Sequence, residues 1–179
     1  METPSVLVIS VLLSLAIALP SSTALAQQKQ QVSFASPAEN SKYTQQLTVA
    51  VGDVPGHNVR VYEIHHTYHD NAPVIGGLKL VEEWDRGSSD LTGGNGTGTT
   101  YNVYVMENGD RFAARINAIV QRKSGAAIAT GVGAITGGTG RFAEIQGTVQ
   151  FSAHPNGRAG VAESQTEIEY SIGKSTDTK

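Results

Sequence analysis

The chain has 179 residues, of which 39% are hydrophobic, 16% charged, 20 Gly and none Cys, a composition typical of one compact domain. Its formal net charge of -3 excludes the strongly basic surface of a nucleic-acid-binding protein, so we expect no nucleic-acid partner. Because Cys is absent, the chain can form no disulfide, no thiolate metal site and no lipidated N-terminal Cys.

Residues 1–26 have the pattern of a secretion signal. An uncharged apolar run over 6–19 precedes the small-residue pattern Ala-Leu-Ala at 24–26, which is typical of a cleavage site. The run is shorter than the roughly 20 apolar residues that a membrane-spanning helix needs. We therefore predict a secreted or periplasmic protein that does not associate with a membrane after cleavage, beginning with a flexible leader at 27–31.

Residues 32–173 are predicted to form one β domain, followed by a disordered tail at 174–179. Val, Ile, Thr, Tyr and Phe recur with a period of two, and Gly, Pro, Asn or Asp mark turns about every ten residues. A short lead-in near 32–34 could add an edge. The predicted strands are 47–51, 58–68, 78–85, 100–107, 111–121, 128–135, 148–153 and 161–172.

The predicted fold is all-β, a single eight-stranded antiparallel closed β-barrel of calycin-like type. A barrel is favoured over a sandwich because long strands joined by short turns leave no edge exposed. Eight strands enclose either packed side chains or one small ligand. The stretch 87–100 (GSSDLTGGNGTGTT) is expected to be a flexible loop that could cover the barrel mouth.

Two motifs in the C-terminal half resemble a known family. ITGGTGRFAEIQG at 135–147 resembles the GGTG-K/R-F signature of the allene oxide cyclase and dirigent-like β-barrel superfamily, and Asn-Gly-Asp-Arg at 108–111 resembles a hairpin upstream of it in secreted bacterial relatives. The resemblance covers 101–172. It implies an eight-stranded barrel, often trimeric, whose apolar cavity steers the cyclisation or coupling of a reactive small molecule without a cofactor.

The residues of this signature themselves favour a structural turn. Gly137 and Gly138 permit backbone conformations closed to other residues, and Phe142 is expected in the core. A phosphate loop is excluded because no Lys-Ser/Thr follows. The N-terminal half matches no catalytic motif of the family, so no catalytic residue is carried over from it.

Glu82 is the predicted catalytic residue. If Leu78 and Leu80 point into the barrel, strict alternation places Glu82 and Trp84 on the same inner face. A carboxylate beside the only Trp of the chain would have its pKa raised by desolvation and could act as a general acid or base. The alternative is a wet end of the sheet, where Glu82 pairs with a neighbouring base.

The predicted ligand-binding residues are Trp84, Tyr62, Tyr101 and Arg115. Arg60 or Arg115 could hold a buried acid or a ligand carboxylate, because the planar guanidinium binds carboxylates with two hydrogen bonds. Tyr101 and Tyr104 point to opposite faces of a strand, so at most one of them lines a cavity.

No metal site and no cofactor are predicted. Three histidines occur within 65–69, but on a strand His65 and His69 lie about 13 Å apart, while His66 points the other way. They cannot bind one ion without a bulge or a turn, so the favoured interpretation is a strand that ends at a solvated rim.

The predicted function is an exported barrel that binds a small apolar or amphipathic molecule and could act as a cofactor-free cyclase, isomerase or stereochemistry-directing protein. The alternative is a non-enzymatic exported protein with a packed barrel, acting through its surface or through oligomer contacts. We expect the protein to form a homo-oligomer, either a dimer or a trimer. The two hypotheses differ in whether side chains such as Leu80, Phe112 and Ile116 fill the interior.

Overall fold

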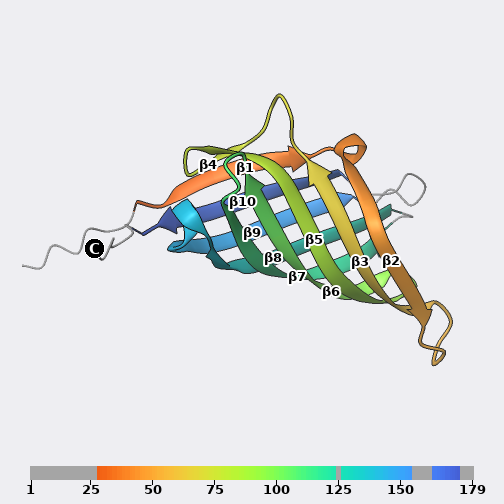
Figure 1. The fold of residues 1–179 in the computed structure, drawn as a ribbon. Coiled ribbons are helices and arrows are strands. Elements are labelled where there is room, and N and C mark those ends of the chain that lie inside the picture. Colours follow the sequence, from red (N-terminus) through yellow and green to blue (C-terminus); the bar gives the residue numbers. More distant parts are fainter. Residues whose placement is uncertain (1–27, 124–125, 155–162, 174–179) are drawn as a thin grey trace, which may run out of the picture.

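A computed structural model describes residues 28–123, 126–154 and 163–173, so the predicted signal and tail lie outside the described residues. The described chain forms ten strands and two 3₁₀ turns (Figure 1): β1 (Gln30–Ser36), η1 (Ala38–Asn40), β2 (Ser41–Ala50), β3 (His57–Thr67), β4 (Val74–Ile75), β5 (Leu78–Thr92), β6 (Asn95–Met106), β7 (Arg111–Lys123), β8 (Ala126–Gly138), η2 (Gly140–Phe142), β9 (Ile145–His154) and β10 (Glu163–Ile172). Neither 3₁₀ turn approaches the length of a helix that could cross a membrane.

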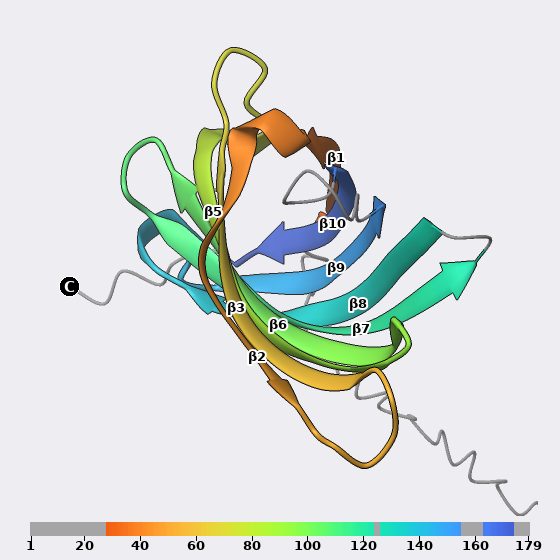
Figure 2. The same ribbon diagram turned by 90° about the vertical axis from the view of Figure 1, so that its right-hand side faces the viewer.

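All ten strands belong to one antiparallel arrangement with the order β1-β10-β9-β8-β7-β6-β5-β3-β2, and β4 pairs with β5. The prediction of an all-β antiparallel fold is confirmed. The predicted number of eight strands is wrong, because the lead-in forms a full strand beginning at Gln30, inside the expected leader, and because β4 is added. The sheet curls round (Figure 2), but no pairing joins β1 to β2 within the described residues. A closed barrel is therefore not confirmed.

The predicted loop at 87–100 is wrong, since it forms the ends of β5 and β6. Gly93 and Gly94, with φ of 59° and 83°, make the tight turn between the two strands. Gly87 lets two segments approach closely, because a Cβ there would lie 2.8 Å from Tyr62 Oη. The glycines that suggested flexibility instead serve a turn and a close contact, so the structure has no lid at this place.

β5 contains a β-bulge between Leu80 and Glu82, where its register with β6 shifts. The carbonyl of the extra residue, Val81, accepts a hydrogen bond from the Tyr68 amide. A bulge inserts one residue and so reverses the alternation of inner and outer side chains. Leu80 and Glu83 are therefore both buried, although they are an odd number of residues apart.

At one end of the curled sheet, next to η2, aromatic side chains fill the interior. The Phe112 and Tyr104 rings stack with their centroids 4.6 Å apart, and Phe142 lies 5.4 Å from Phe112. All three side chains are fully buried, and the prediction that Phe142 enters the core is confirmed. Large aromatic side chains that fill an interior in this way contribute strongly to stability.

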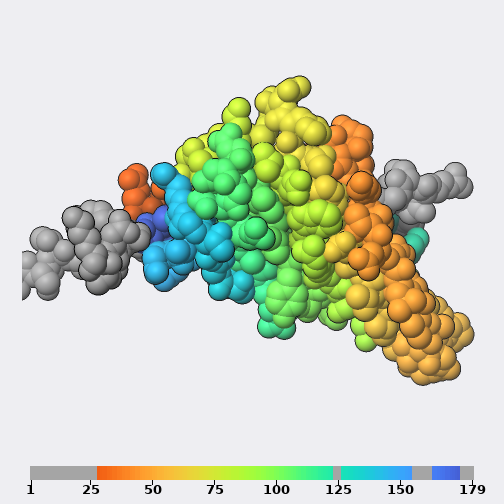
Figure 3. Space-filling view, viewed as in Figure 1, coloured from red at the N-terminus to blue at the C-terminus, as the bar shows by residue number. Residues whose placement is uncertain are grey.

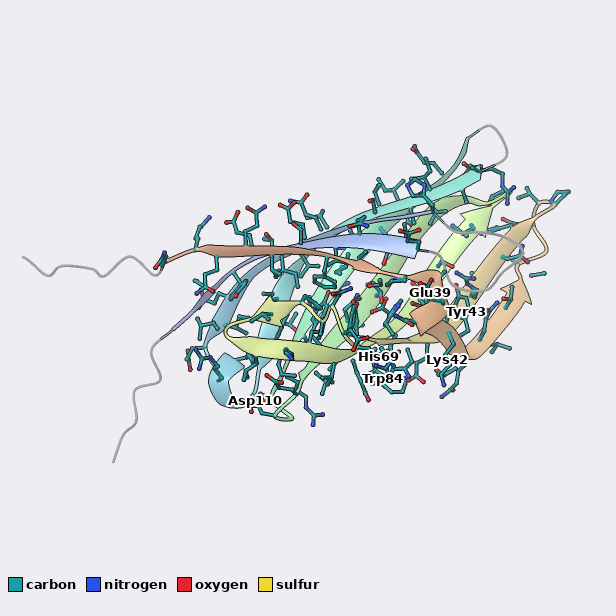
Figure 4. The ribbon with its side chains drawn as sticks, turned by 90° about the horizontal axis from the view of Figure 1, so that it is seen from above. Glu39, Lys42, Tyr43, His69, Trp84 and Asp110 are labelled. Atoms are coloured by element: carbon teal, nitrogen blue, oxygen red, sulfur yellow. The ribbon has the colours of Figure 1, made fainter. Side chains whose placement is uncertain are left out.

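The two motifs of the C-terminal half meet at this packed end. Asp110, in the hairpin before β7, accepts a hydrogen bond from the Arg141 amide in η2 at 3.0 Å, and Figure 4 shows Asp110 beside this turn. This bond and a second from Asn108 lower the pKa of Asp110. Gly140, with φ of 52°, leaves room for the Asp110 carboxylate. The signature is thus a structural turn, as its residues predicted.

Candidate functional site

The half of the sheet away from η2 borders a cavity of about 530 Å³. Apolar side chains of β7, β8 and β9 form one wall: Ile116, Ala118, Val120, Ala129, Val149 and Phe151. Polar side chains of β3, β5 and β6 form the other wall: Arg60, Tyr62, His66, Glu83, Asp85 and Asn102. The packed interior expected from the non-enzymatic alternative therefore applies to one half of the molecule only.

Glu83 is the buried acid of the polar wall, with 3% of its surface exposed. Tyr68 Oη donates a hydrogen bond to its Oε2 at 2.6 Å, and Asn102 Nδ2 donates one to its Oε1 at 2.8 Å. Ser36 Oγ lies 2.6 Å from the same Tyr68 oxygen. Burial, followed by the charge of Asp85, raises the pKa of Glu83 to about 7. This carboxyl group can therefore exchange a proton near neutral pH.

His66 and Asp85 stand beside Glu83 on the same inner face. His66 Nε2 lies 3.3 Å from Asp85 Oδ2, and Ser41 Oγ lies 2.7 Å from His66 Nδ1. Burial alone would lower the pKa of His66, but the hydrogen bond to Asp85 and the charges of Glu83 and Asp85 raise it above the ordinary value. The two carboxyl groups and the imidazole thus form one group of interacting titratable side chains in the cavity wall.

Arg60 brings a cation into the same wall, further along β3. Its guanidinium carbon lies 5.0 Å from the centre of the Tyr62 ring and 5.5 Å from that of Tyr43. Burial, followed by the charge of Asp85, raises the pKa of Tyr62 to about 12. The Tyr62 hydroxyl therefore stays protonated, and the two rings hold the Arg60 side chain in place.

Several buried polar atoms of the cavity wall have no hydrogen-bond partner within the described residues. They include Arg60 Nε, Asp85 Oδ1 and Ser89 Oγ. Buried donors and acceptors are normally paired, because leaving one unpaired costs free energy. These atoms provide both donors and acceptors for polar groups of a bound molecule.

The predicted inner position of Glu82 and Trp84 is wrong: both lie on the outer face of β5 (Figure 4 labels Trp84). The Trp84 ring stacks on His65 with centroids 3.9 Å apart, and its Nε1 donates a hydrogen bond to Glu82 Oε2 at 3.0 Å. The physical reason is the bulge at Val81, which exchanges the faces of every later residue of β5. Glu83 and Asp85 take the inner positions instead.

Tyr101 and Arg115 also face outward, so their predicted place in a cavity is wrong. Tyr101 is 52% exposed and lies between the buried residues Thr100 and Asn102. The Arg115 guanidinium carbon lies 5.9 Å from the centre of the Tyr101 ring. Of the five predicted site residues, Tyr62 alone lines the cavity.

The residues that the sequence analysis missed are Glu83, Asp85, Asn102 and Tyr68. The pair Glu82-Glu83 is visible in the sequence, but which of the two points inward depends on the bulge. Tyr68 follows the last residue of β3, where alternation no longer predicts direction. Alternation could have predicted the inner position of Asn102, because Asn102 lies two residues from the fully buried Tyr104 and so shares its face of the strand.

The histidines do not converge. His65 and His66 lie on opposite faces of β3, as alternation predicted, and His69 lies beyond the end of that strand. In the part of the chain that the structure describes, no three His, Asp or Glu side chains are arranged to hold a metal ion.

Comparison with known proteins identifies the fold. No family model matches the chain, and no curated protein matches it significantly in sequence. The solved structure of the pterocarpan synthase dirigent protein GePTS1 superposes with a TM-score of 0.51 and 16% identity, over 86% of this chain and 96% of that one. For the pterocarpan synthase dirigent protein PsPTS1 the TM-score is 0.50 with 13% identity, over 82% and 97%.

The fold is dirigent-like. The family resemblance inferred from the C-terminal motifs is confirmed to this extent. At identities of 16% and 13% the likeness concerns the dirigent-like fold alone, so the chemistry has to be argued from the cavity.

Proposed function

We propose that this protein binds a small amphipathic molecule in the cavity and uses Glu83 to transfer protons to and from it. The observation that supports this most is a buried carboxyl group on the cavity wall whose pKa is raised to about 7. A general acid or base is most effective when its pKa lies near the working pH.

The two walls of the cavity favour a molecule with one apolar and one polar side. Ala118, Ala129 and Phe151 would contact the apolar side, and Arg60 Nε and Asp85 Oδ1 would contact polar groups. Such a combination of apolar lining and a few polar groups is typical of small-molecule sites. Because the walls differ, a bound molecule would be held in one orientation.

The proposed reaction is a cofactor-free cyclisation or isomerisation. Neutral Glu83 gives one proton to the bound molecule, and its carboxylate takes one back as the new bond forms, so nothing is consumed. Holding a flexible molecule in one reactive conformation lowers the barrier and selects one stereochemical product. The dirigent proteins with which the chain shares its fold support a role in directing stereochemistry.

We also propose export, with residues 1–26 as the signal and no membrane association of the mature protein. The support is the apolar run and the Ala-Leu-Ala pattern in the sequence. N-terminal sequencing of the protein recovered from outside the cytoplasm should begin at Gln27, and retention of residues 1–26 would contradict the proposal.

Native mass spectrometry after incubation with a metabolite extract tests binding in the cavity. Ala118→Phe puts a phenyl ring into the cavity and should strongly reduce ligand retention, because Ala118 lies on the inner face of β7. Ala134→Phe is the matched control, since Ala134 is exposed on the outer face of the neighbouring strand β8. Equal retention by both variants would place the ligand outside the cavity.

Glu83→Gln separates binding from chemistry. The amide keeps the size of the carboxyl group and can still accept a hydrogen bond from Tyr68, so the bound ligand should be retained. Its conversion, followed by chromatography of the released molecule, should fall at least a hundredfold for loss of a general acid or base. Unchanged conversion would exclude Glu83 as the proton donor, and unconverted ligand in the parent protein would favour binding without catalysis.

A further inference from the structure

The outermost strand β2 has a long unpaired edge. It pairs with β3 on one side, and within residues 28–123, 126–154 and 163–173 no strand pairs with its other side. From Thr44 to Ala50 every residue is exposed. The β2–β3 hairpin projects beyond the rest of the molecule (Figures 1 and 3), so a neighbouring chain can reach this edge.

Beyond the start of β2, this edge lacks the features that usually prevent strands from pairing with other chains. Such edges are normally short, or are protected by Pro, by bulges or by charged side chains. The segment Tyr43–Gly52, YTQQLTVAVG, contains neither Pro nor a charged residue. The one irregularity in its pairing with β3 lies at its start, between Tyr43 and Gln45. The remaining strand is a regular template for another strand.

The outer face of the hairpin is apolar up to this edge. Leu47 pairs with Val61 and Val49 with Val59 across β2 and β3. Their exposed fractions are 66%, 57%, 56% and 37%, respectively. Apolar side chains exposed together in this way mark a surface that associates with another one.

We propose that two copies of this chain join through β2, antiparallel and edge to edge, to form one continuous sheet. A two-fold axis perpendicular to the sheet keeps the outer faces of both copies on the same side. With the axis at Thr48, Leu47 of each copy lies opposite Val49 of the other. The two apolar hairpin faces then form one surface across the junction, and β-branched and aliphatic side chains pair favourably across strands.

The charges that flank the segment fit the same register. Lys42 precedes it and Asp53 follows it, so antiparallel pairing brings the lysine of one copy near the aspartate of the other at both ends. Asp53 Oδ1 contacts His57 Nδ1 at 2.6 Å, and 54% of the Asp53 side chain is exposed, so the lysine of the other copy can reach it. A parallel arrangement would instead place like charges together. The partner is therefore a second copy, and the proposal does not depend on the chemistry of the cavity.

Light scattering coupled to size-exclusion chromatography of the full chain tests the dimer. The parent protein should elute with twice the chain mass, and Val49→Lys should shift it to the monomer mass. Ile119→Lys is the matched control. Ile119 and Val49 are both 56% exposed, but Ile119 lies on β7, which is paired with a strand on each side. A monomeric parent, or a dimer that survives Val49→Lys and is lost in Ile119→Lys, would overturn the proposal.

Cysteine crosslinking tests the register, because the chain has no Cys of its own. Residues directly opposite each other in antiparallel strands lie about 4.5–5.5 Å apart at Cα, within the range of a disulfide. Thr48→Cys should crosslink with itself on mild oxidation, and Thr130→Cys on β8 should not. Gln46→Cys should crosslink efficiently only when mixed with Ala50→Cys. Equal crosslinking of Thr48→Cys and Thr130→Cys would exclude pairing through β2.

Discussion

The η2 end and the open end of the sheet are built from the same strands but are filled differently. At the η2 end the inner positions carry large side chains such as Phe112, Leu80 and Tyr104, all fully buried. At the open end the inner positions of β7 and β8 carry Ala118 and Ala129, which leave the cavity. The size of the side chains along single strands therefore separates a half that stabilises the fold from a half that can hold a molecule.

The difference between the two ends also separates fold from chemistry. The signature at 135–147 lies at the packed end, and none of its residues lines the cavity. The acid, the imidazole and the arginine of the cavity come from β3 and β5, which the resemblance does not cover. A motif of this kind therefore predicts the dirigent-like fold without predicting the reaction.

The largest expected effect is on the free energy of unfolding, when one phenylalanine from each end is replaced by alanine. Phe112→Ala should lower the free energy of unfolding by about 3–5 kcal/mol, because it leaves a cavity between Tyr104 and Phe142. Phe151→Ala should cost only about 1–2 kcal/mol, since this partly buried ring already borders empty space. Urea denaturation of both variants measures the difference, and equal losses would mean that the open end is packed as well.

The second effect concerns the pH dependence of stability. The pKa of Glu83 is about 7 in the folded protein against an ordinary 4.5, so folding favours the protonated form and stability is lost as the pH rises from 4.5 through 7. At about 1.4 kcal/mol per pKa unit the loss is roughly 3 kcal/mol. Glu83→Gln should remove most of this slope in urea denaturation at several pH values.

The contribution of Glu83 to the pH dependence can be separated from that of other groups. The pKa of His66 is also raised, so its contribution is present below the ordinary pKa of 6.5 and is lost as the pH rises through the folded value, which leaves a smaller slope in Glu83→Gln. Glu82→Gln is the matched control, because its side chain is 43% exposed on the outer face. A slope that disappears in Glu82→Gln instead would show that the faces of β5 are assigned wrongly.

The third effect tests the turn at the packed end. Gly140 has φ of 52°, and a Cβ there would collide with the Asp110 carboxylate. Gly109, with φ of 88°, has nothing within 4 Å of such a Cβ. Gly109→Ala should therefore cost about 1 kcal/mol for backbone strain alone, and Gly140→Ala about 2–3 kcal/mol for strain and collision together. Thermal unfolding distinguishes them, and equal losses would mean that Asp110 is not held against η2.

Much of the fold could be predicted because its signals are local. Alternation located eight of the strands, and Asn-Gly at 108–109 located a hairpin. The errors have local causes too: Gly and Ser at 87–98 have low strand propensity but lie in a hairpin that both neighbouring strands support. Tertiary pairing overrides such propensities.

The site could be predicted less well because it depends on one inserted residue. Strict alternation from Leu80 places Glu82 on the inner face of β5, whereas the bulge at Val81 places Glu83 there. Nothing in the residues at 80–83 marks a bulge. The outward position of Arg115, however, could be predicted from the sequence. Phe112, Ala114 and Ile116 alternate with Arg115 and form the apolar inner face of β7.

The smallest expected effect therefore compares two arginines. Arg60→Ala removes the cation held between Tyr43 and Tyr62 in the cavity wall and should weaken binding of the retained ligand about tenfold or more, because charge-assisted hydrogen bonds contribute about 1.5–3 kcal/mol. Arg115→Ala removes an exposed side chain near Tyr101 and should change stability by less than about 0.5 kcal/mol and leave affinity unchanged. Titration with the isolated ligand measures the affinity of both variants, and urea denaturation measures their stability. If Arg115→Ala weakened binding and Arg60→Ala did not, the ligand would lie on the outer face of the sheet, because the two arginines are on opposite faces.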